Sequence, residues 1–184
     1  MKTQDLQALS SDLIGVMVVG RELPAYIFSK KFKNHLFFDA DITTSDELIC
    51  AIREMVLMSV GTLLPVAVFS SKTREVLSIF APDENWEKNI IDLTKSMHER
   101  GNYYGYIIVD SSLRWVAYQT DPVSLGVFAF DGKNPWSEVS QDTRDCFVNR
   151  RRMEDLFISE SMSDIDLINI FGREYIFELI NNYS

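Results

Sequence analysis

The spacing of apolar residues along this chain predicts two long helices in its first half. Residues 45–60 place apolar side chains about every three or four positions behind a Thr44 or Ser45 cap, which predicts a helix ending near Gly61. The same period predicts a helix over residues 84–100. We expect both helices to lay an apolar face on a sheet.

Short apolar runs separated by polar turns predict the strands of that sheet. The first two runs, residues 65–70 and 74–80, are a few polar residues apart, which is the spacing of a β-hairpin. Three further runs follow one another through short turns: residues 104–109, 113–119 and 125–130. Turns this short join antiparallel neighbours, because parallel neighbours need a crossover of about a dozen residues. The sequence therefore predicts an antiparallel meander over about 104–130.

The ends of the chain complete the predicted fold. Residues 3–13 predict a short opening helix. Residues 14–19 either extend it or form a buried strand, which their β-branched residues favour, and residues 35–42 predict a strand. The chain after the meander predicts two helices, residues 140–158 and residues 164–182, with Gly172 as a possible break in the second. We expect a single α+β domain over residues 1–184, in which an antiparallel or mixed sheet is covered by helices, two of them C-terminal.

The charge of the chain bears on its partners. There are 27 acidic residues against 18 Lys and Arg, a net charge of −9. This excess disfavours direct binding of nucleic acid, which needs clustered positive charge, and favours a basic protein partner. No apolar run reaches the roughly 18 residues of a membrane span, and the first residues lack the pattern of a secretory signal. We therefore expect a cytoplasmic protein that does not bind a membrane.

Spacings typical of cofactor or metal sites are missing from the sequence. Cys50 and Cys146 are far apart in helix-like segments, which predicts two buried thiols, and His35 and His98 are the only histidines. Neither a dinucleotide-binding glycine motif nor a phosphate-binding loop is present. We expect no cofactor and no metal.

One acidic motif does suggest chemistry. Asp39-Ala40-Asp41-Ile42-Thr43 follows an apolar run and resembles the first motif of the haloacid-dehalogenase-like hydrolases, a DxDx(T/V) loop at the end of a strand. The resemblance implies that Asp39 is a nucleophile, that Asp41 is a general acid or base, and that the loop binds magnesium. It extends to residues 66–70, which are similar to that family's strand ending in Ser or Thr, and to residues 107–110, which are similar to its later acidic strand. The lysine that the family requires would be Lys72, Lys88 or Lys95.

The predicted topology favours a different function. The resemblance implies parallel strands separated by helices, whereas residues 65–80 and 104–130 have the spacing of antiparallel hairpins. A magnesium-dependent phosphohydrolase that uses Asp39 and Asp41 is therefore the alternative hypothesis.

Aromatic residues of the meander suggest a binding surface. Trp115 and Tyr118 fall on opposite faces of one strand, because strand side chains alternate, and one of these faces could be exposed. Tyr and Trp are enriched at protein interfaces. We predict that these two residues anchor a partner together with the nearby acids Asp110, Asp121, Asp131 and Glu138.

The sequence thus predicts a non-catalytic acidic protein that docks and neutralises a basic protein. Small acidic bacterial immunity proteins, which block cationic toxin nucleases, are the general class, by analogy of charge and size. One basic cluster stands apart from this pattern, Arg150-Arg151-Arg152. It is either a solvated helical surface with local ion pairs or a site for phosphate or an acidic peptide.

Overall fold

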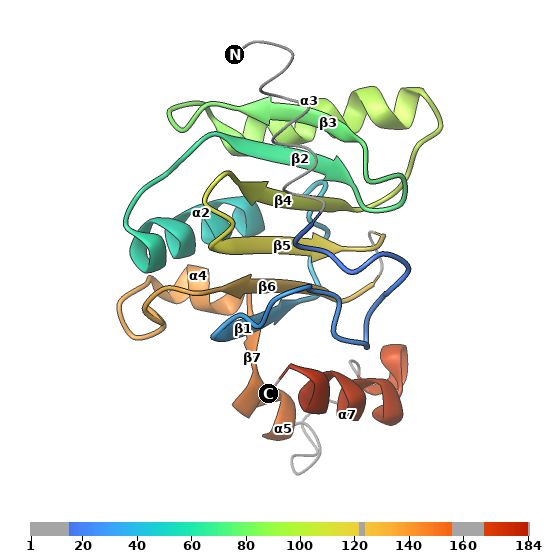
Figure 1. Ribbon diagram of the computed structural model, residues 1–184, viewed down its shortest axis with the longest axis vertical. Coiled ribbons are helices and arrows are strands. Elements are labelled where there is room, and N and C mark those ends of the chain that lie inside the picture. The colour runs from blue at the N-terminus through green and yellow to red at the C-terminus, as the bar shows by residue number, and fades with distance from the viewer. Residues whose placement is uncertain (1–14, 122–123, 156–167, 184) are drawn as a thin grey trace.

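An antiparallel sheet forms the centre of the molecule (Figure 1). The computed structural model describes residues 15–121, 124–155 and 168–183 and shows an α+β fold. The strand order is β3-β2-β4-β5-β6-β1-β7, and every pair of neighbours is antiparallel. The strands are β1 (Asn34–Phe38), β2 (Val66–Ser70), β3 (Val76–Phe80), β4 (Tyr106–Asp110), β5 (Trp115–Gln119), β6 (Gly126–Phe130) and β7 (Val148–Asn149).

Helix boundaries follow local sequence signals. In α2 (Asp46–Val60), the Ser45 side chain accepts a hydrogen bond from the backbone of Leu48, and Gly61 closes the helix at a φ of 84°. In α3 (Trp86–Glu99), Asn85 accepts from the backbone of Lys88 in the same way. The remaining helices described are α4 (Gln141–Asp145), α5 (Arg150–Asp155) and α7 (Arg173–Asn182).

Both faces of the sheet are covered. Helices α2, α3 and α4 lie behind the sheet in Figure 1, over an apolar cluster that includes Trp115, Phe128 and Trp86. Residues 15–32 and helix α7 lie in front of it, over a second cluster that includes Tyr118 and Val127. The alternating side chains of each central strand are therefore buried on both sides, and β2, β4, β5 and β6 are buried at every position.

The predicted hairpin and meander are confirmed. Strands β2 and β3 pair as predicted, and β4, β5 and β6 pair in sequence order. The N-terminal strand predictions hold less well. Of the predicted strand over residues 14–19, the described residues 15–19 contribute a single bridge, from Met17 to Phe28. Strand β1 ends at Phe38 rather than at Ile42. The predicted helix over residues 3–13 lies outside the described residues.

The long helix predicted over residues 140–158 is wrong. Helix α4 stops at Asp145, and the chain turns so that Phe147 packs at 6.3 Å from the ring of Phe38. Val148 and Asn149 then pair with β1, and α5 begins only at Arg150. Burial of Phe147 and the pairing with β1 outweigh the helical periodicity of the segment, because both depend on strands distant in sequence. Gly172, the predicted break, precedes α7 with a φ of 84°.

Candidate functional site

The aromatic residues predicted to anchor a partner are inside the protein. Trp115 and Tyr118 are 0% and 1% exposed, because the helices cover one face of β5 and the N-terminal segment covers the other. The expectation of an exposed aromatic face on the sheet is therefore wrong. A signal was present in the sequence, because strands buried on both faces are near-continuous apolar runs rather than alternating ones, and β4, β5 and β6 have such runs.

Asp110 is also buried, and it organises the turn between β4 and β5. Its side chain accepts hydrogen bonds from Trp115 Nε1 at 2.7 Å, from the backbone N of Ser112 at 2.8 Å and from the Ser112 hydroxyl. Leu113 in this turn has a φ of 53°, a conformation that non-glycine residues seldom adopt. Asp110 thus stabilises the fold, and at 1% exposure it cannot touch a partner.

The remaining three predicted acids do not form one surface. Asp131 pairs with Lys30 at 2.7 Å, and Glu138 pairs with Lys133 at 2.5 Å. Asp121 follows β5, whereas Asp131 follows the antiparallel strand β6, so the two lie at opposite ends of the sheet. The structure joins Asp110 and Trp115 inside the protein, but it does not gather the predicted partner-binding residues on one surface.

The motif with Asp39 and Asp41 forms a helix-capping turn. Asp41 Oδ1 accepts from the backbone N and the hydroxyl of Thr43 at 2.8 and 2.7 Å, and its Oδ2 accepts from the Thr44 hydroxyl at 2.8 Å. The buried Gln119 holds the same turn, since its Oε1 accepts from Ile42 N at 2.8 Å. Both oxygens of Asp41 are therefore engaged just before α2 begins, while Asp39 is exposed.

The fold differs from the one that the hydrolase resemblance implies. Strand β1, which precedes the motif, runs antiparallel to both of its neighbours, β6 and β7. That family's motif requires parallel strands, so the fold inferred from the resemblance is wrong. Within the described ranges, no group of three or more His, Cys, Asp or Glu side chains is arranged to hold a metal ion.

A different set of acids comes together between α2 and α4. They border a cavity of about 330 Å³. We call it the acidic groove. Its carboxylates are Asp46, Glu47, Glu54 and Asp142, and none of the described residues that line it carries a positive charge. Asp46, Glu47 and Asp142 are exposed to solvent.

Glu54 joins the two walls of the groove. From the middle of α2, its carboxylate accepts hydrogen bonds from the backbone N and the hydroxyl of Ser140, at 3.4 and 3.2 Å, and from the hydroxyl of Thr143. Ser140 is itself the N-cap of α4 and accepts from the backbone of Thr143. Polar groups at the start of α4 thus hold this helix against α2, which leaves the other three carboxylates at the surface.

Two thiols line the groove, and burial together with nearby acids raises the pKa of both. Partial burial, a hydrogen bond to Glu87 at 3.0 Å and the nearby acids raise the pKa of Cys50 to about 11. Burial and the charges of Glu47, Asp145 and Asp142 raise the pKa of Cys146. Cys50 is exposed and Cys146 partly exposed, so the prediction of two buried thiols is wrong. Both thiols stay protonated at neutral pH, a state in which a thiol is a poor nucleophile.

Sequence analysis missed the groove because its halves are far apart in the chain. Asp46 and Glu47 have the pattern of first-turn acids that complement a helix dipole, and Asp142 has the same position in α4. A signal was present in hindsight, because both first turns are acidic and follow a serine cap. Only packing of α4 on α2 shows that these two helix starts belong to one surface.

Comparisons of the chain with protein-family models, with curated proteins and with solved structures found no match. Among the described residues, no helix has the length and apolar character needed to cross a membrane. The function must therefore be inferred from the chemistry of the surface itself.

Proposed function

We propose that this protein is a non-catalytic binding protein that docks a basic protein through the acidic groove. The observation that supports this proposal is a concave surface with four carboxylates and no cation among its described lining residues, in a chain of net charge −9. Surfaces of opposite charge accelerate encounter and select partners, and the long-range part of this attraction weakens with salt.

The groove suits a projecting Lys or Arg side chain of the partner. Asp46, Glu47 and Asp142 are exposed acceptors around it, and arginine binds carboxylates in a bidentate geometry. Glu87 beside Cys50 extends the negative charge toward α3. A cationic side chain that enters the groove would exchange water for several carboxylate oxygens at once.

The partner class that we propose is a cationic toxin nuclease, and the protein would then be a bacterial immunity protein. A nuclease cleft that holds phosphates presents clustered Lys and Arg, and an acidic surface placed over it excludes nucleic acid. We place such an inhibitor in the cytoplasm, because a nuclease must be blocked where the nucleic acid is. The immobilised chain should capture a basic protein from cells that encode it, and should inhibit any nuclease activity of the purified partner.

A pair of matched variants tests whether the groove is the contact surface. The double variant Glu47→Gln, Asp142→Asn removes two charges from the groove, and the double variant Glu174→Gln, Glu178→Gln removes two exposed charges from α7. We expect the groove variant to weaken binding of the purified partner by roughly a hundredfold, and the α7 variant by less than about threefold. Calorimetry at two salt concentrations measures both.

Equal losses in the two variants would mean that net charge alone attracts the partner, and would refute the groove as the site. Capture of an acidic partner, or binding that strengthens with salt, would refute the proposed function as a whole.

A further inference from the structure

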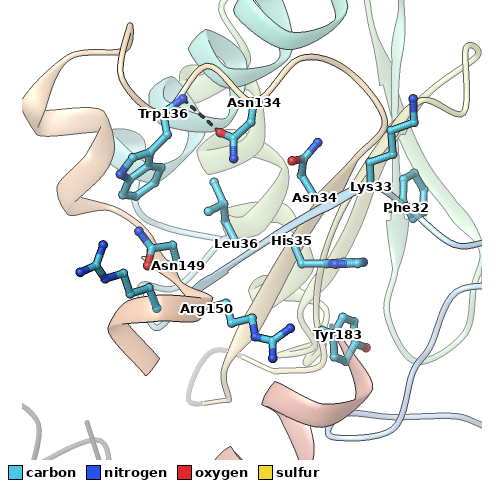
Figure 2. A pocket seen from close by; sticks show the side chains of 11 residues that line it. Phe32, Lys33, Asn34, His35, Leu36, Asn134, Trp136, Asn149, Arg150 and Tyr183 are labelled. Carbon is cyan, nitrogen blue, oxygen red and sulfur yellow. Dashed lines mark hydrogen bonds between the residues drawn. The ribbon is translucent and has the colours of Figure 1, made fainter. Parts of the chain in front are cut away.

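A second cavity has the opposite charge. It measures about 390 Å³ and lies where β1 meets β7 and the start of α5 (Figure 2). Its cationic residues are Lys33, Arg150 and Arg151, and no described residue that lines it is acidic. In a chain with nine more acidic than basic residues, three cations around one hollow are a marked local reversal. We call this cavity the basic pocket.

Most cationic groups of the basic pocket lack an internal partner. Arg150 Nε donates to Glu154 at 2.7 Å on its own helix. Lys33 and Arg151, by contrast, have no ion pair or side-chain hydrogen bond within the described part of the chain. The exposed arginines and the Arg150–Glu154 pair agree with a solvated helical surface, one of the two alternatives from the sequence, whereas Arg151 is exposed without such a pair among the described residues.

Two asparagine side chains add oriented donors. Asn134 Oδ1 accepts from the backbone N of Trp136 at 3.1 Å, and Asn149 Oδ1 accepts from the backbone N of Arg152 at 2.9 Å. With each carbonyl oxygen engaged, the amide nitrogen of each side chain remains, and neither has an acceptor among the described residues. Figure 2 shows Asn134 and Trp136 on one side of the pocket, across from His35 and Tyr183.

The wall of the pocket also contains an unsatisfied polar atom. His35 Nε2 is buried without a hydrogen-bond partner among the described residues, and the ring of Tyr183 lies 5.2 Å from the imidazole ring. Burial lowers the pKa of His35 to about 4, so the ring is neutral at pH 7. Buried polar atoms are rarely left unpaired in folded proteins, which makes this wall a place where a ligand or water completes the structure.

We propose that the basic pocket binds a small molecule through a phosphate group. Two free cations and two amide donors match the several acceptor oxygens of a phosphate, and arginine is well suited to this geometry. The cavity is larger than phosphate alone and falls within the usual range of small-molecule pockets, about 300–1,000 Å³. Trp136, Phe32 and Leu36 supply an apolar wall for the organic part of the ligand. This site is separate from the acidic groove and does not depend on the proposed docking function.

The experiment uses two probes, inorganic phosphate and phenyl phosphate, titrated into the full chain in low-salt buffer at pH 7. Calorimetry gives the affinity, and NMR of the histidine rings gives the location. The chain has two histidines, so His98 on α3 serves as an internal reference for His35. We expect phosphate to bind in the millimolar range and phenyl phosphate roughly tenfold more tightly, with shifts at His35 and none at His98.

Neighbouring arginines provide the matched control. Arg151→Gln removes a cation that lines the pocket, and Arg152→Gln removes a neighbouring exposed cation that does not line it. We expect roughly tenfold weaker binding of phenyl phosphate in the first variant and a change below about twofold in the second. Equal losses in the two variants, shifts at His98 alone, or no binding at a probe concentration of about 10 mM would overturn the proposal. The groove variant Glu47→Gln, Asp142→Asn should bind the probe as the wild type does, so this test and that of the docking function fail separately.

Discussion

Two sets of carboxylates in this protein have opposite roles. Asp110 ends β4, and Asp41 belongs to the acidic motif that follows β1; the fold uses the oxygens of both to fix turns. Asp46, Glu47 and Asp142 have ordinary positions in the first turns of helices, and they remain exposed around the acidic groove. An acid that is prominent in the sequence can have its oxygens fully hydrogen-bonded within the fold, whereas the acids available for binding can lack any distinctive sequence pattern. Three predictions test this division.

The largest effect is expected at Asp110. Replacement by Ala removes three hydrogen bonds and leaves the buried Trp115 Nε1 without an acceptor, so we expect the free energy of unfolding to fall by about 3 kcal/mol. Urea denaturation followed by tryptophan fluorescence measures it. Asp110→Asn, which keeps one acceptor oxygen, should lose less. A loss below about 1 kcal/mol in the alanine variant would contradict the structural role.

A smaller effect is expected at Asp41, with Asp39 as its control. Asp41→Ala removes the acceptor for Thr43 and Thr44 ahead of α2, and should cost about 1–2 kcal/mol. Asp39 is exposed, so Asp39→Ala should change stability by less than about 0.5 kcal/mol. Thermal or urea unfolding compares the two. If Asp39→Ala were the more damaging change, or if it abolished a magnesium-dependent turnover of an aryl phosphate, our assignment of these residues would be wrong.

The smallest effect concerns the potential in the groove. In a Cys146→Ser background, alkylation of Cys50 by iodoacetamide should follow a pKa of about 11, and Glu87→Gln should lower that pKa. Because folding raises this pKa, the folded state favours the protonated thiol, and its contribution to stability is lost as the pH rises toward 11. A rate that is half-maximal near the ordinary thiol value, about 8.5, would contradict the burial and the acidic surroundings that we assign to Cys50.

Local signals in the sequence were sufficient for much of the fold. Ser45 and Gly61 bound α2 as predicted, and the short turns identified the hairpin and the meander. These features depend on residues that are neighbours in the chain, where capping and turn chemistry act.

The functional surfaces depend on contacts between distant residues, and for that reason the sequence did not predict them. Glu54 meets Ser140 across 86 positions, and the pairing of Phe37 with Val148 converts a predicted helix into β7. Burial of Trp115 on one face and Tyr118 on the other likewise depends on segments far away in sequence. The basic pocket is an intermediate case, since its arginines form a cluster in the sequence directly after Asn149, but Asn134 comes from a separate loop.

The hydrogen bonds of Glu54 also affect how the groove should be mapped by mutation. An alanine scan treats each side chain as a separate contribution to binding, yet loss of Glu54 would release the first turn of α4 and displace Asp142 with it. A large loss of affinity in a Glu54 variant would then reflect the displacement of α4 rather than the loss of a contact between Glu54 and the partner. Asp46 and Glu47, which make no such link to α4, are the positions at which a scan would measure the interface directly.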